Sequence, residues 1–320
     1  MNVENIDALT PVRERKSYAD HPFGLYNIEL TNKCPMNCVM CPRTKNMTRP
    51  QGFMDYRLFQ HAIDELASAN PEFVREHAVW LHHFGESLLH PRFGDCISYA
   101  SSKGVLTGLS INPFMLSETV AEELVCAEPA ALYISLDGHD DESFYRIRGM
   151  KKGYQVSHDR LMDFLELKNR RGAKIQIVVS MIDFPMNDES IQARKSYWES
   201  LPGVDQFLLK SFSTWDGNAS DINSLFSNSG RDVDAVDTST VVCTLPWEVM
   251  TIAWNGDVLP CCYDYDAKVV LGNMGEQSLS KIWNGEKMQS LRKEFIANRV
   301  ANPLCKNCEK LYLPQERRRF

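Results

Sequence analysis

Cys34-Pro-Met-Asn-Cys38-Val-Met-Cys41 is the stretch from which the rest of this chain can be interpreted. It follows directly on a strand-like run at residues 25–30. Three thiolates on one loop can hold three corners of a cubic [4Fe–4S] cluster, which usually has four cysteine ligands. The missing fourth cysteine would leave one iron open to a group that is not part of the protein.

Two other readings of these cysteines fit less well. Structural zinc prefers four ligands, usually as two closely spaced pairs, and Cys-x3-Cys-x2-Cys does not match that pattern. Disulfides need an oxidising compartment, and the polar, acidic start Met1-Asn-Val-Glu-Asn-Ile-Asp is not a signal peptide. The spacing therefore favours an iron–sulfur site with an open iron.

Composition narrows the class of protein. The chain has 320 residues, of which 43% are hydrophobic and 24% charged, and a formal net charge of −7. These values are ordinary for a globular protein, and the negative charge argues against a nucleic-acid partner. No apolar run is long enough to cross a membrane. Ten cysteines without an export signal predict a cytoplasmic protein with clustered metal ligands.

From residue 24 onward, strand-like and helical patterns alternate. Such alternation predicts an α/β fold with a parallel sheet whose functional loops follow the carboxyl ends of the strands. The expected strands are 25–30, 78–83, 107–111, 131–136, 174–182 and 204–211, and the expected helices are 56–68, 93–103, 117–125, 154–171 and 187–200.

The cysteine spacing after a first strand resembles that of the radical S-adenosylmethionine (SAM) enzymes. The resemblance implies a partial (β/α)6 barrel at residues 24–212, after a lead-in at residues 1–23. It also implies that SAM binds the open iron of a [4Fe–4S] cluster held by Cys34, Cys38 and Cys41. Reductive cleavage of SAM would give a 5′-deoxyadenosyl radical that takes a hydrogen atom from the substrate.

Three further loops are similar to the SAM-contact loops of that family. His83-Phe-Gly85-Glu86 resembles a Gly-Gly-Glu motif that receives the SAM ammonium, although a simple turn with a solvated Glu would read the same way. The other two loops follow the third and fourth strands, and an arginine after the fourth could pair with the SAM carboxylate. The resemblance thus implies cofactor contacts from Gly85, Glu86, Asn112, Ser135, Asp137 and Arg148.

A second group of cysteines follows a polar stretch at residues 213–240, which reads as a linker or mobile loop. Asn255-Gly256 between apolar runs predicts a β-hairpin, and residues 279–298 read as a helix. The hairpin and a Cys-x2-Cys loop would bring four thiolates together. From these residues alone, zinc and an iron–sulfur cluster are equally suitable. The cysteines are Cys243, Cys261, Cys262, Cys305 and Cys308.

Residues 241–320 resemble the SPASM/Twitch extension of radical SAM enzymes, a small domain of hairpin and helix. The resemblance implies one auxiliary [4Fe–4S] cluster with Cys243, Cys261, Cys305 and Cys308 as ligands, although Cys262 could replace its neighbour Cys261. A cluster with four cysteine ligands would transfer electrons only. The two-part plan is similar to that of the aminocyclitol dehydrogenases of aminoglycoside biosynthesis.

The resemblance implies oxidation of a carbohydrate or cyclitol alcohol to a ketone, with an electron donor such as flavodoxin or ferredoxin. By position, Lys210 and Asp183 are candidates for the group that accepts the hydroxyl proton. Epimerisation with Cys262 as thiol hydrogen donor is a second hypothesis. Modification of a ribosomal peptide is a third, although residues 1–23 are too few for a leader-binding domain. A non-catalytic metal scaffold remains as a fourth.

Overall fold

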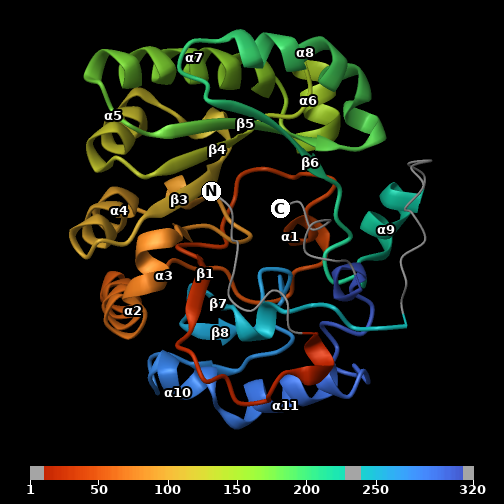
Figure 1. Cartoon of the computed structure of the whole chain (residues 1–320). Coiled ribbons are helices and arrows are strands. Elements are labelled where there is room, and N and C mark those ends of the chain that lie inside the picture. Colours follow the sequence, from red (N-terminus) through yellow and green to blue (C-terminus); the bar gives the residue numbers. More distant parts are fainter. Residues whose placement is uncertain (1–10, 228–238, 313–320) are drawn as a thin grey trace.

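The computed structural model describes residues 11–227 and 239–312. One nine-stranded sheet in the order β6-β5-β4-β3-β2-β1-β7-β8-β9 organises the chain (Figure 1). Strands β1 to β6 are parallel to their neighbours, and the sheet is not closed, since β6 and β9 are its edges in the described residues. The fold class predicted from the sequence, an α/β partial barrel, is confirmed.

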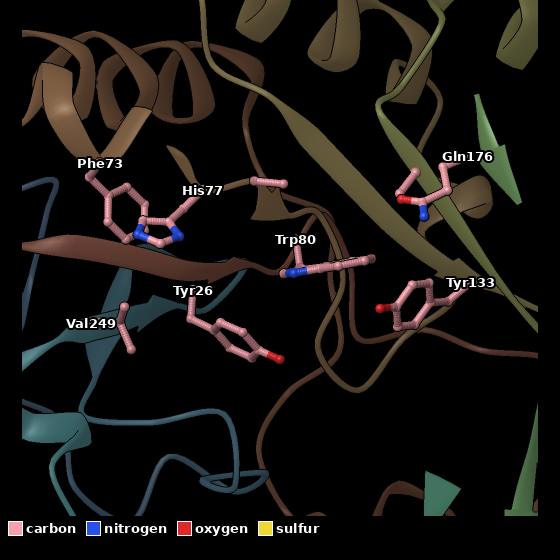
Figure 2. A pocket seen from close by; sticks show the side chains of 9 residues that line it. Tyr26, Phe73, His77, Trp80, Tyr133, Gln176 and Val249 are labelled. Atoms are coloured by element: carbon pink, nitrogen blue, oxygen red, sulfur yellow. The ribbon is translucent and has the colours of Figure 1, made fainter. Parts of the chain in front are cut away.

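Five of the six barrel strands lie close to the predicted ranges, whereas the strand predicted at 78–83 is only two residues long. They are β1 (Gly24–Ile28), β2 (Val79–Trp80), β3 (Thr107–Ile111), β4 (Ala131–Ser135), β5 (Gln176–Asp183) and β6 (Gln206–Ser211). Strand β1 contains a β-bulge, because its pairing with β7 passes over Tyr26 between Leu25 and Asn27. A bulge redirects a side chain, and Tyr26 faces the interior of the barrel (Figure 2).

Helices cover the outside of the barrel strands (Figure 1). The five predicted helices appear as α2 (Tyr56–Ala69), α4 (Phe93–Ser102), α5 (Glu118–Ala127), α7 (Gly153–Arg171) and α8 (Asp188–Ser200). Polar residues fix their starts: the Asp55 carboxylate accepts the backbone N–H of Arg57 and Leu58, and Ser117 caps α5. Their apolar faces belong to one continuous buried cluster with the sheet.

Short helices were not predicted from the sequence. They are α1 (Pro42–Lys45), α3 (Pro71–Glu76), α6 (Asp141–Arg148) and α9 (Ser220–Ser227). Helix α6 has only eight residues, and Phe144 and Ile147 are its buried apolar side chains, so the pattern is too short to stand out in the sequence. A capping box between Asp140 and Ser143 starts it, and Gly149 ends it at φ 72°.

The predicted C-terminal hairpin is confirmed. Its strands are β7 (Val249–Ile252) and β8 (Asp257–Leu259), and Gly256 takes φ 87° in the turn. Strand β9 (Gly272–Asn273) pairs with β8. The sequence did not predict that β7 would pair in parallel with β1 and so extend the barrel sheet. The predicted helix is divided at Asn284-Gly285 into α10 (Leu279–Trp283) and α11 (Glu286–Ile296).

The stretch predicted as a linker, 213–240, is packed over the part that the structure describes. The Trp215 indole N–H donates to the Met40 carbonyl at 3.0 Å, next to Cys41. Asp216 is fully buried and forms an ion pair with Lys268. Residues 228–238 of the predicted linker lie outside the described residues. Among the described helices, none has both the length and the apolar character required to cross a bilayer.

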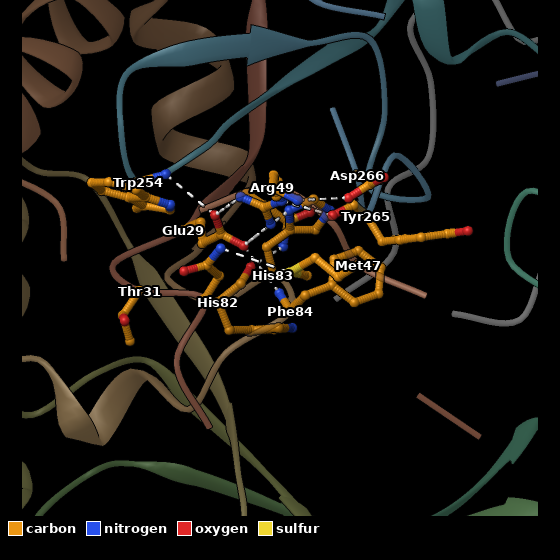
Figure 3. A network of polar contacts seen from close by, with 12 residues as sticks. Glu29, Thr31, Met47, Arg49, His82, His83, Phe84, Trp254, Tyr265 and Asp266 are labelled. Carbon is orange, nitrogen blue, oxygen red and sulfur yellow. Dashed lines mark hydrogen bonds and ion pairs between the residues drawn. The ribbon is translucent and has the colours of Figure 1, made fainter. Parts of the chain in front are cut away.

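Glu29 joins the barrel to the C-terminal hairpin (Figure 3). Its side chain is fully buried and accepts two hydrogen bonds from the Arg49 guanidinium, at 2.5 and 2.6 Å. The backbone N–H of Trp254, beside the hairpin turn, donates to the same carboxylate at 3.2 Å, and that of Phe84 at 3.3 Å. Burial alone would raise the pKa of Glu29, but Arg49 and His83 hold it at about 2.

Replacing Arg49 by Met should destabilise the protein strongly, because the Glu29 carboxylate would remain buried without its partner. Breaking one side of a buried ion pair typically costs about 3–5 kcal/mol, which urea unfolding at neutral pH would detect. Arg171→Met is the matched control, since Arg171 pairs with Glu122 at the surface at 2.8 Å. Equal effects from the two variants would contradict a special role for the buried pair.

Candidate functional site

The three clustered cysteines lie on the loop that follows β1, at the carboxyl edge of the sheet. Two backbone hydrogen bonds hold this loop against the end of α6: Asn37 N–H donates to the Arg148 carbonyl and Val39 N–H to the Ile147 carbonyl, both at 3.0 Å. Cys38 is buried, and Cys34 and Cys41 are half-buried. The structure therefore places the cysteine loop where the sequence predicted it.

Arg148 connects this loop to the end of β4. Its Nη1 donates to Cys38 Sγ at 3.5 Å, and its Nη2 pairs with the fully buried Asp137. Asp137 also accepts the backbone N–H of Ile182 at 2.8 Å. The Nε of Arg148 is buried and has no hydrogen-bond partner among the described residues. One donor of the guanidinium is thus left to serve a bound group.

The loop after β2 presses against the loop after β1. A Cβ on Gly85 would lie 1.9 Å from the Thr31 carbonyl oxygen, so only glycine fits there. Glu86 is buried, and its carboxylate accepts the backbone N–H of Leu88 at 3.2 Å and of Asn112 at 2.9 Å. Burial raises the pKa of this carboxyl to about 7. Glu86 therefore joins the loops that follow β2 and β3.

Asn112 and Ser135 complete the predicted set at this edge. Asn112 Nδ2 lies 3.5 Å from the Ser135 carbonyl, and the Ser110 and Ser135 hydroxyls are 3.2 Å apart. The structure thus brings together all the residues that the sequence analysis assigned to SAM. Their roles as cofactor contacts stay a prediction. The residues are Gly85, Glu86, Asn112, Ser135, Asp137 and Arg148.

Aromatic side chains fill the amino-terminal part of the barrel interior (Figure 2). The rings of Trp80 and Tyr133 have centroids 4.7 Å apart. Gly108 leaves room for Trp80, since a Cβ there would lie 2.6 Å from the indole ring. A cavity of about 50 Å³ remains between these rings and Tyr26. The interior therefore has an aromatic floor below the carboxyl edge.

Lys210 and His82 extend above this floor. The Lys210 ammonium lies 5.0 Å from the Tyr133 ring centroid, and burial together with Arg148 lowers its pKa to about 8. His82 Nδ1 accepts the backbone N–H of Ser110 at 3.0 Å, so its proton is on Nε2. Burial, Lys210 and His83 lower the pKa of His82 to about 3. The sequence analysis did not identify His82, because its tautomer depends on a residue of the next strand.

The structure separates the two proton acceptors proposed from the sequence. Lys210 is the register partner of Ile182, and Asp183 is the partner of Ser211. Neighbouring residues of a strand point to opposite faces of the sheet. Asp183 therefore does not share the face from which Lys210 reaches Tyr133, and the geometry favours Lys210.

The five C-terminal cysteines converge. Burial raises the pKa of the Cys261 thiol, and the nearby thiols Cys262, Cys305 and Cys308 raise it further. Burial and the nearby Cys243 thiol raise the pKa of Cys308 to about 12. No three His, Cys, Asp or Glu side chains of the described residues meet closely enough to hold a single metal ion; the cysteines of a four-iron cluster bind at its separate corners.

Cys262 lies on the barrel side of this group. Its carbonyl accepts a hydrogen bond from His83 Nε2 at 2.8 Å, and His83 Nδ1 lies 3.4 Å from Glu29. Burial raises the pKa of Tyr26, and the Cys262 thiol adds to this rise. Cys261, in contrast, accepts the backbone N–H of Tyr263 at its sulfur, at 3.3 Å. The two adjacent cysteines therefore have different surroundings.

Comparison with known proteins matches both parts of the chain. The radical SAM superfamily matches residues 28–194, and the SPASM iron–sulfur cluster-binding domain matches residues 243–309. A tungsten-containing aldehyde ferredoxin oxidoreductase cofactor-modifying protein of Pyrococcus furiosus is 24% identical over 317 residues, covering 88% of this chain and 86% of that protein. The S-adenosyl-L-methionine-dependent 2-deoxy-scyllo-inosamine dehydrogenase of Niallia circulans is 24% identical over 301 residues, covering 93% and 97%.

Solved structures show the same fold. BtrN in complex with AdoMet and 2-DOIA covers 93% of this chain and 98% of its own, with a TM-score of 0.61 and 20% identity. Streptococcus suis SuiB bound to its precursor peptide SuiA covers 92% of this chain and 71% of its own, with a TM-score of 0.65 and 14% identity.

The cofactors follow from these families. A radical SAM domain binds a [4Fe–4S] cluster and SAM, and a SPASM domain binds auxiliary iron–sulfur clusters. The cysteine loop, the unpartnered Arg148 Nε and the convergent C-terminal thiols are donor groups that suit them. This chain therefore belongs to the radical SAM superfamily and continues into a SPASM iron–sulfur domain.

Proposed function

We propose that this radical SAM enzyme oxidises a secondary alcohol of a carbohydrate or cyclitol to a ketone in the cytoplasm. The observation that carries the proposal is the position of Lys210 above Tyr133 in the barrel interior, with Cys262 close to Tyr26 on the side of the C-terminal cysteines. This arrangement provides a proton acceptor and a neighbouring electron acceptor around one interior space.

We propose the cofactor contacts from the resemblance to radical SAM enzymes, and the geometry described above is compatible with them. Cys34, Cys38 and Cys41 would hold the first cluster, and Arg148 would use its free Nε towards the carboxylate of SAM, as an arginine commonly does. Gly85 and Glu86 would receive the SAM ammonium, and Asn112, Ser135 and Asp137 would lie along the same cofactor. Cys243, Cys261, Cys305 and Cys308 would hold the auxiliary cluster.

Iron content tests this assignment. After anaerobic reconstitution we expect about eight irons per wild-type chain, as for two [4Fe–4S] clusters. Alanine at Cys34, Cys38 and Cys41 together should lower the count to about four, because only the auxiliary cluster would remain. Iron and acid-labile sulfide analysis gives the numbers directly.

Cys262 provides the matched control. Cys262→Ser should keep about eight irons per chain. Cys261→Ser should destabilise the auxiliary cluster, because of these two adjacent cysteines only Cys261 is assigned as a ligand. The reverse result would make Cys262 the ligand in place of Cys261. A wild-type count of about four irons would contradict the auxiliary cluster assignment.

The barrel interior suits a ring that carries hydroxyl groups. Aromatic faces such as those of Trp80 and Tyr133 can pack against the apolar C–H face of a sugar or cyclitol, and a few polar groups then fix the orientation. His82 offers an Nε2–H donor, and the Ser110 and Ser135 hydroxyls lie at the same end of the interior. The site thus combines an apolar floor with polar groups at one edge.

The proposed oxidation balances in three parts. The cofactors, when bound, would supply two of them: removal of one hydrogen atom from the carbinol carbon and acceptance of one electron. Lys210, in its neutral form, accepts the hydroxyl proton. A secondary alcohol that loses a hydrogen atom, a proton and an electron becomes a ketone.

Lys210 gives the reaction a pH dependence. Only the neutral amine can accept a proton, and its pKa is about 8, so turnover should rise with pH and level off above that value. Lys210→Met should reduce turnover about 10²–10⁴-fold, the usual contribution of a general base, and remove this pH dependence. SAM cleavage should continue, which 5′-deoxyadenosine analysis would show.

Lys174→Met is the control, since Lys174 is exposed at the opposite end of the barrel. It should leave the rate and the pH profile unchanged. A Lys210→Met enzyme with normal turnover would remove Lys210 from the mechanism.

The relatives support the oxidation without deciding the substrate. The Niallia circulans protein is named as a dehydrogenase of 2-deoxy-scyllo-inosamine, and SuiB was solved with a precursor peptide. Cys262 favours epimerisation as a second candidate, because its thiol lies near Tyr26 and could return a hydrogen atom to a carbon radical.

Product mass distinguishes the two reactions. With candidate cyclitols or sugars, dithionite and SAM, oxidation should give a product lighter by two hydrogens. Epimerisation would leave the product mass unchanged in ordinary water. In deuterated solvent it would introduce one deuterium into the product. A Cys262→Ser variant that still forms the lighter product would exclude the thiol from the reaction.

A further inference from the structure

The end of α6 and the following loop form a basic surface. Residues 143–158 contain no acidic side chain, although the whole chain has a net charge of −7. Arg146, Lys151 and Lys152 are exposed there, and the Tyr145 ring between them is 46% exposed, with the Lys151 ammonium 5.6 Å from its centroid. We call these four side chains the α6 basic patch.

The α6 basic patch lies directly beside the cysteine loop. The carbonyls of Ile147 and Arg148 accept the backbone N–H groups of Val39 and Asn37. Gly149 is so close to Asn37 that a Cβ would lie 2.7 Å from its backbone oxygen. An electron that enters at the patch therefore has a short covalent and hydrogen-bonded route to Cys38.

The cysteine loop adds to this positive surface. Residues 30–54 also contain no acidic side chain, and Lys45 is exposed within them, although it lies 3.9 Å from Asp221 of α9. Glu142, one turn before Arg146, is the nearest acidic residue of α6 along the chain. The region around the first cluster site is thus locally basic on an acidic protein.

We propose that the α6 basic patch is the docking surface for a small acidic electron-carrier protein of the flavodoxin type. A complementary charge pair steers association and fixes the orientation, and an exposed Tyr beside cations is typical of protein interfaces. The carrier is oxidised by one electron and the first cluster is reduced by one. The inference rests on the proposed function, because a radical SAM reaction consumes an electron from outside the chain.

Charge reversal tests the surface. The test variant is Lys151→Glu with Lys152→Glu, and the control is Arg170→Glu with Lys174→Glu, which makes the same charge change at the other end of α7. Two rates of 5′-deoxyadenosine formation are compared at low ionic strength. One uses purified flavodoxin with its NADPH-dependent reductase, and the other uses dithionite, a small chemical reductant.

We expect the flavodoxin-driven rate of the test variant to fall about tenfold or more, within the range of electrostatic steering, with the dithionite rate and the control variant unchanged. Salt should reduce the difference by screening. Equal flavodoxin-driven rates in the two variants would overturn the proposal. An equal loss of the dithionite-driven rate in the test variant would also overturn the proposal, because these lysines would then act in SAM cleavage itself.

Direct binding gives a second readout. Flavodoxin titrated into the reconstituted holoenzyme should bind the wild type and the control variant alike, and the test variant at least tenfold more weakly. Unchanged affinity would contradict the docking surface. If the wild type cleaved SAM with neither reductant, the proposed function would fail, while the titration would still decide whether the patch binds the carrier.

Discussion

A buried carboxylate holds the two halves of this protein together. Glu29 follows β1 directly, and its backbone N–H bonds to Ile252 of β7 while its side chain binds Arg49, which follows the cysteine loop. An unpaired carboxylate at this depth would be costly. The loop after β1, the loop after β2 and the hairpin must therefore keep their positions together, since each of them supplies a donor to the same two oxygens.

The shared strand β1 has consequences for both cofactor sites. Its carboxyl end leads into the cysteine loop, and its edge pairs with β7 of the SPASM hairpin. His83 extends the link, because it lies between Glu29 and the Cys262 carbonyl. A displacement of the hairpin would thus also shift the loops that surround the first cluster site. The protein is better described as one sheet with two cofactor sites than as two linked domains.

Local patterns explain how much the sequence could predict. The barrel strands and the Asn255-Gly256 hairpin are encoded by near neighbours, and all of them appear, although β2 is shorter than predicted. The β1–β7 pairing joins residues more than two hundred positions apart, so no local sequence pattern predicts it. The role of His82 depends on Ser110 in another strand. The choice between Lys210 and Asp183 depends on the face of the sheet on which each side chain lies. The register of β5 and β6 determines this face, and the sequence alone does not give that register.

The geometry around Tyr26 bears on why oxidation suits this fold. The bulge in β1 directs Tyr26 into the interior, where it lines the same cavity as Tyr133. The cysteine loop follows the carboxyl end of this strand, and the SPASM hairpin pairs with its edge, so the two proposed cofactor sites adjoin a single strand. A redox-neutral reaction needs only the first of these sites. The proposed oxidation would need both at once, and the backbone pairing of the SPASM hairpin with β1 would keep the two sites next to each other.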